Sequence, residues 1–60
     1  MPLLTIWAYV QQLAERSNGR SISSNIAGQD VYYRNGFFET DGIVTDDIDE
    51  FAEYLHSQNA

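Results

Sequence analysis

The chain contains no cysteine, no lysine and only one proline. Without cysteine it can form neither a disulfide nor a thiolate metal site that would support a small core. A chain of 60 residues buries only about 60% of its unfolded surface on folding, so we expect a single, marginally stable domain over residues 1–60. No apolar stretch approaches the roughly 20 residues that a membrane-spanning helix needs. The sequence therefore predicts one small domain without a membrane segment.

The N-terminal segment lacks the features of a secretory signal. Met1 to Val10 is largely apolar, but it has neither a basic start nor a small-residue cleavage site. We expect Met1 to be the native start and the protein to be cytoplasmic. The formal net charge of −6 argues against anionic membranes, DNA and RNA as direct ligands.

Negative charge is concentrated in the C-terminal third of the chain. Between Phe37 and Leu55 there are seven carboxylates and no basic residue, whereas all three arginines lie earlier, at positions 16, 20 and 34. The chain is nevertheless 43% hydrophobic and 13% aromatic, which is too apolar for a disordered acidic tail. The charge block is therefore expected on a folded surface, where it would attract basic surfaces and repel nucleic acid.

The first element is predicted to be a helix over Leu3 to Asn18. Apolar residues recur there at helical spacing, and Pro2 and Gly19 suit its two ends. The stripe consists of Leu3, Ile6, Trp7, Val10, Leu13, Ala14 and Ser17. Trp7, Tyr9 and Tyr33 are expected in the core or at its rim, without a functional role.

The middle of the chain changes to the alternation typical of strands. Residues 21–26 alternate loosely, and residues 31–40 place β-branched and aromatic residues around Asn35-Gly36. An Asn-Gly pair favours a two-residue type I′ hairpin turn, in which both positions need a positive φ. This turn sets Arg34 opposite Phe37. The register then predicts one face with Val31, Tyr33, Phe38 and Thr40, and another with Tyr32, Arg34, Phe37 and Glu39.

A second helix is predicted after the Asp41-Gly42 turn and a short lead of Ile43-Val44. Thr45, Asp46 or Asp47 can each serve as its N-cap. Its buried stripe is expected to be Ile48, Phe51, Ala52 and Leu55. The order α-β-β-β-α predicts an α+β fold, with a three-stranded antiparallel sheet and both helices on one face.

No residue pattern indicates an active site, a cofactor site or a metal site. His56 is the only histidine, and no nucleophile or acid accompanies it at a recognisable spacing. Residues 46–50 are rich in carboxylates but lack the glycine of a calcium loop, and acids in the first turn of a helix already suit its dipole. We therefore expect a protein that is not an enzyme and holds no cofactor or metal.

Two surfaces are candidates for binding a partner. The first is acidic, with an aromatic residue at its edge: Glu39, Asp41, Asp46, Asp49, Glu50, Glu53 and Tyr54. The second is the outer face of the hairpin, where Tyr32, Arg34 and Phe37 belong to residue types found in binding hot spots. The alternative for the acidic surface is that its charges only face solvent. The alternative for the hairpin is that its aromatic residues only stabilise cross-strand pairing. The sequence leaves open which surface makes the contact.

By its size, its acidity, its lack of cysteine and its α-β-β-β-α order, the whole chain resembles small phage-encoded inhibitors of the anti-CRISPR and DNA-mimic type. This resemblance implies a stoichiometric inhibitor that occupies the basic groove of a nucleic-acid-binding protein in the host cell. A Cas-type effector is one such partner, and the mimicry would cover a short DNA segment. The alternative is an interaction module, such as a small subunit or an antitoxin-like partner, that binds through Tyr32, Arg34 and Phe37.

Overall fold

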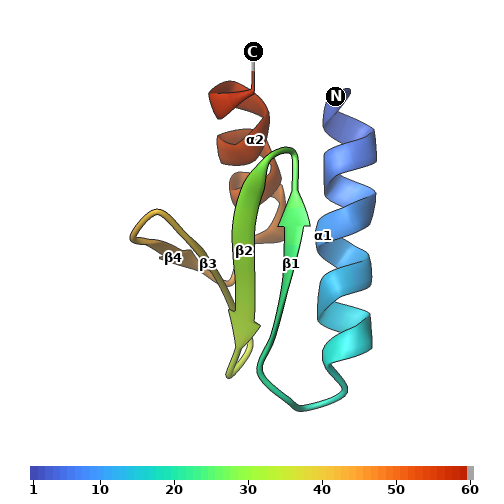
Figure 1. The fold of residues 1–60 in the computed structure, drawn as a ribbon, viewed down its shortest axis with the longest axis vertical. Coiled ribbons are helices and arrows are strands. Elements are labelled where there is room, and N and C mark those ends of the chain that lie inside the picture. The colour runs from blue at the N-terminus through green and yellow to red at the C-terminus, as the bar shows by residue number, and fades with distance from the viewer. Residues whose placement is uncertain (60) are drawn as a thin grey trace.

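The computed structural model describes residues 1–59, in the order α1, β1, β2, β3, β4 and α2. Helix α1 (Leu3–Ser17) starts directly after Pro2 and ends at Asn18, which has a left-handed backbone with φ of 47°. The predicted helix is confirmed, although Pro2 lies just before its first turn. The four strands form one antiparallel sheet in sequence order, and α2 (Ile48–Gln58) follows it (Figure 1).

The sheet has four strands, so the prediction of three was wrong. The strands are β1 (Ile22–Ile26), β2 (Gln29–Arg34), β3 (Phe37–Thr40) and β4 (Ile43–Thr45). Strand β4 is the missed one, because three residues after Asp41-Gly42 resemble a lead into the helix. Both turn residues have positive φ, 49° and 80°, which closes a two-residue hairpin and sets Val44 opposite Glu39.

The hairpin predicted around Asn35-Gly36 is confirmed in position and register. Arg34 pairs with Phe37, Tyr33 with Phe38, and Tyr32 with Glu39. The two turn residues have φ of 53° and 83°. The remaining hairpin turns at Ala27-Gly28 with the same sign of φ at both positions, which joins β1 to β2.

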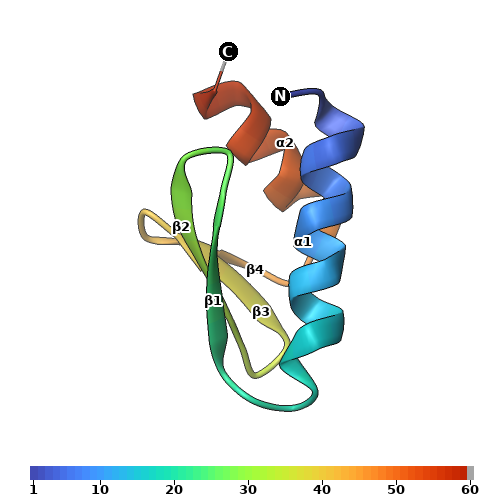
Figure 2. The same cartoon turned by 45° about the vertical axis from the view of Figure 1, so that its right-hand side comes forward.

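Both helices lie against the same face of the sheet. The inner-face residues Val31, Phe38 and Thr40 are buried, whereas Tyr32, Arg34 and Phe37 on the other face are exposed. The rings of Phe38 and Phe51 stack with centroids 5.4 Å apart, which joins β3 to α2. Figures 1 and 2 show α1 running beside β1, with α2 further along the sheet.

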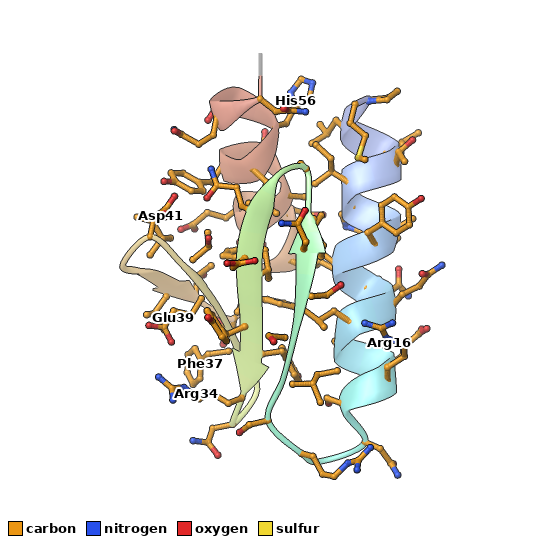
Figure 3. The ribbon with its side chains drawn as sticks, in the orientation of Figure 1. Arg16, Arg34, Phe37, Glu39, Asp41 and His56 are labelled. Atoms are coloured by element: carbon orange, nitrogen blue, oxygen red, sulfur yellow. The ribbon has the colours of Figure 1, made fainter. Side chains whose placement is uncertain are left out.

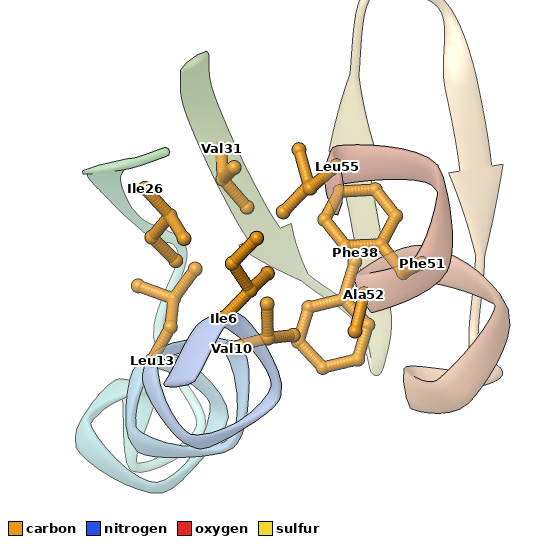
Figure 4. Close-up of a cluster of buried hydrophobic side chains, with 9 residues drawn as sticks. All are labelled: Ile6, Val10, Leu13, Ile26, Val31, Phe38, Phe51, Ala52 and Leu55. Carbon is orange, nitrogen blue, oxygen red and sulfur yellow. The ribbon is translucent and has the colours of Figure 1, made fainter. Parts of the chain in front are cut away.

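One hydrophobic core lies between the sheet and the two helices (Figure 4). Its buried members are Ile6, Val10, Leu13, Ile26, Val31, Phe38, Phe51, Ala52 and Leu55. Trp7 and Tyr33 pack against it and are half-buried, as expected for the rim, but the same expectation for Tyr9 was wrong because its side chain is exposed. Tyr9 lies on the flank of α1, beside the buried stripe, where it lines a groove next to β1.

Candidate protein-binding surfaces

The solvent side of α2 carries an acidic surface, which we define as Asp46, Asp49, Glu50 and Glu53. All four side chains are exposed. Successive residues of a helix are about 100° apart, so Glu53 falls between Asp49 and Glu50 around the helix axis. The buried residues Phe51, Ala52 and Leu55 occupy the opposite side. Helix geometry therefore gathers three of the predicted acids on one strip, with Asp46 just before the helix.

Two aspartates at the start of α2 also hold the fold together. Asp47 is the N-cap: its Oδ1 accepts hydrogen bonds from the backbone N–H groups of Asp49 and Glu50, at 3.0 and 3.2 Å. The Oδ1 of Asp49 accepts a hydrogen bond of 2.9 Å from the indole Nε1 of Trp7 on α1. None of these three N–H donors carries a charge that would offset that of the carboxylate. The bonds therefore fix two negative charges in place beside Glu50 and Glu53.

The acidic surface has no cationic partner within the described part of the chain. The ion pair between Arg34 and Glu39, at 3.0 Å, is the only one among residues 1–59. The other two arginines, Arg16 and Arg20, lie in the last turn of α1 and in the loop after it. The field of the acidic surface is therefore not balanced by a neighbouring positive side chain.

The outer face of the sheet carries a patch of apolar side chains, which we call the outer sheet patch: Tyr32, Phe37 and Val44. Their exposed fractions are 48%, 44% and 57%. Sequence reasoning missed Val44 because it missed β4. The Asp41-Gly42 turn was the available signal, since a two-residue hairpin there puts Val44 on the same face as Glu39.

Arg34 and Glu39 lie next to the outer sheet patch and form an ion pair with each other. They are diagonal neighbours on β2 and β3, and Figure 3 shows both on the side of the molecule that bears Phe37. Glu39 was predicted to support the helix acids, but it lies on the sheet face opposite to the one that α2 covers. Asp41 lies at the tip of the β3–β4 hairpin. The predicted acidic set is thus divided between α2 and the hairpin.

Tyr54, predicted as an aromatic anchor at the edge of the acidic surface, packs partly against the core. Its side chain is half-buried, so only part of the ring is open to a partner. Within residues 1–59, no group of three or more acidic or histidine side chains is placed to hold a metal ion. None of the helices described is both long enough and apolar enough to span a bilayer.

Comparison with protein-family models, with curated proteins and with solved structures found no match to this chain.

Proposed function

We propose that this protein is a small inhibitor that uses its acidic surface to block the basic nucleic-acid-binding surface of another protein. One observation carries the proposal: the four carboxylates of the acidic surface are exposed, clustered and without a cationic partner among the described residues. Asp49 stabilises the fold through its bond to Trp7, and acids in the first turn suit the helix dipole, but Glu53 has neither role. Like charges so close together also repel each other. A partner that supplies lysines and arginines would relieve that repulsion on binding.

The proposed mechanism is occupation of a surface, without turnover. A basic groove that holds a phosphate backbone gains much of its affinity from charge, so an acidic strip on a rigid helix competes for the same side chains. The capped N-terminus of α2 and the Trp7–Asp49 bond keep the strip ordered before binding, which lowers the entropy that association costs. A Cas-type effector complex is one candidate of this class, and the strip is long enough only for local mimicry.

The second candidate function is an interaction module that binds through the outer sheet patch. It is favoured by the exposure of Phe37 and Val44, which are diagonal neighbours on β3 and β4. Aromatic residues in such a patch are common anchors in protein interfaces. Arg34 contributes less to binding than its residue type suggests, because its guanidinium already donates a hydrogen bond to Glu39.

Paired charge reversals test the first function. In one variant, Glu50→Lys and Glu53→Lys invert two charges on the acidic surface. The control carries Glu15→Lys and Asp30→Lys, which invert the two acidic side chains that lie outside the segment from Phe37 to Leu55. The change in net charge is therefore the same in both variants. All four side chains are exposed, and both variants are expected to fold. Each immobilised variant is used to capture partners from a bacterial lysate.

We expect the wild type and the control to capture the same basic protein, and the Glu50→Lys, Glu53→Lys variant to lose it. Equal capture by both variants would contradict the proposal. Capture that survives the acidic reversals but is lost on replacing Tyr32 and Phe37 with alanine would favour the interaction module instead.

A further inference from the structure

Strand β1 is an open edge of the sheet. It pairs with β2 on one side, and no strand lies on its other side in Figure 1. The two-residue turn at Ala27-Gly28 makes Ile26 and Gln29 a hydrogen-bonded pair, and such pairs alternate with non-bonded ones along an antiparallel ladder. The backbone N–H and C=O groups of Ser23 and Asn25 therefore point away from β2, toward solvent.

The residues of this strand have none of the usual features that prevent another strand from adding to it. It runs for five residues without proline, without a charged side chain and without a bulge in its register with β2. The opposite edge, β4, has only three residues and exposes the backbone groups of a single position, Val44. Strand β1 is therefore the better template for a fifth strand.

An open groove of about 450 Å³ runs between this edge and α1. Its helix wall is formed by Tyr9, Gln12 and Arg16, whose spacing places them on one side of α1. Its sheet wall includes Ser24 and Ile26, which belong to the inner face of β1. Ser24 is only half-buried although it faces inward, because α1 does not cover the sheet fully at this edge.

The charge in the groove is opposite to that of the protein as a whole. Arg16 lines it, in a chain of net charge −6 whose carboxylates lie mainly on α2 and the β3–β4 hairpin. Unlike Arg34, Arg16 makes no ion pair with a described residue. Figure 3 shows Arg16 on α1, well separated from Arg34 and Glu39. A partner that brings a carboxylate into this groove would therefore meet complementary charge.

We propose that the groove binds an extended acidic peptide segment of another protein, which adds to β1 as a fifth, antiparallel strand. Backbone bonds form to Ser23 and Asn25, and the peptide residue opposite Ser24 points into the groove, where its carboxylate meets Arg16. The next inward-facing residue packs against Tyr9 and Ile26. This site is separate from the acidic surface, so it can be occupied independently.

The proposed pairing with β1 suggests a probe peptide, acetyl-Val-Thr-Glu-Thr-Val-amide, whose glutamate lies opposite Ser24. The matched probe carries glutamine at that position. Binding to the ¹⁵N-labelled protein is followed by amide chemical shifts, up to about 5 mM peptide, a concentration that reveals even weak association. We expect the largest shifts at Ser23 and Asn25, and slower amide hydrogen exchange at both residues in the complex.

Two pairs of variants test the geometry and the charge. Ser23→Pro removes an outward N–H without breaking a bond to β2, and Val44→Pro makes the same change at the other edge. Arg16→Gln removes the groove cation, and Arg20→Gln removes an arginine that does not line the groove. We expect Ser23→Pro to abolish binding, and Arg16→Gln to weaken it about tenfold for the glutamate probe but not for the glutamine probe.

The proposal is overturned if neither probe shifts the edge amides, if both probes bind equally well, or if Val44→Pro is the variant that abolishes binding. It is also overturned if the wild type self-associates through β1, because the occupant would then be a second copy of this chain. If Ser23→Pro fails to fold, amide hydrogen exchange in the wild type tests the backbone pairing instead. Exchange at Ser23 and Asn25 that the glutamate probe does not slow would overturn the proposal.

Discussion

The indole N–H of Trp7 on α1 donates a hydrogen bond of 2.9 Å to the carboxylate of Asp49 on α2, 42 residues further along the chain. This bond joins the two helices at the rim of the core, next to the capped start of α2. It connects folding with the proposed function, since one acid of the acidic surface is held by a residue of the hydrophobic layer.

Removing either partner of this bond is expected to lower the stability of the domain. Trp7→Phe and Asp49→Ala should each lower the free energy of unfolding by about 1 kcal/mol, and the double variant by less than the sum. Glu53→Ala is the control, because it removes a neighbouring charge that has no hydrogen-bond partner among the described residues. Urea unfolding followed by circular dichroism measures all four. Full additivity of the two single changes would contradict a direct bond.

The acids of the C-terminal third should differ in what they contribute to stability. Asp47 caps α2 with two hydrogen bonds, so Asp47→Ala should lower the free energy of unfolding by about 1 kcal/mol. Glu50→Ala should change it by less than about 0.5 kcal/mol, since that side chain is exposed. Thermal unfolding of the two variants checks this. Equal losses would mean that Glu50 also has a structural role.

The central hairpin could be predicted from the sequence because its signals are local. Asn35-Gly36 fixes the turn, and the alternation on both sides of it fixes which residues face the core. Strand β4 was missed because three residues are too few to show alternation. Strand β4 forms because it pairs with β3, and the three residues of β4 alone do not indicate that pairing.

The surfaces were predicted less completely than the fold, because contacts between distant segments decide them. The strip on α2 follows from helix periodicity, which places Asp49, Glu50 and Glu53 together. The pairing of Glu39 with Arg34 follows from the predicted hairpin register, although the sequence analysis did not draw it. The Trp7–Asp49 bond, in contrast, requires the packing of two helices. The groove beside β1 depends on where α1 lies over the sheet, which is set by the whole core.

Two phenylalanines offer the same substitution in opposite environments. Phe51 is fully buried and stacks on Phe38, so Phe51→Ala should cost about 3–5 kcal/mol, enough to unfold much of so small a domain. Phe37→Ala removes a ring of the outer sheet patch and should cost about 1 kcal/mol or less. Circular dichroism at increasing urea concentration compares them. Comparable losses would contradict the assignment of Phe37 to an exposed face.

Ionic strength separates the two binding functions. Contact through the acidic surface should weaken steeply as salt rises from about 0.05 to 0.5 M, because charges on exposed side chains are screened. Contact through Tyr32, Phe37 and Val44 should change little, since burial of apolar area drives it. Surface plasmon resonance with a captured partner gives both rate constants. A flat affinity across this range would favour the outer sheet patch.

The most direct measurement of the central claim is an equilibrium competition between this protein and duplex DNA for the captured partner. A fluorescent duplex is bound to the partner, the protein is added, and anisotropy reports displacement. If the acidic surface occupies the nucleic-acid groove, the duplex is released in full, and the Glu50→Lys, Glu53→Lys variant releases it only at a much higher concentration. A ternary complex, in which the partner holds the duplex and this protein together, would contradict the account.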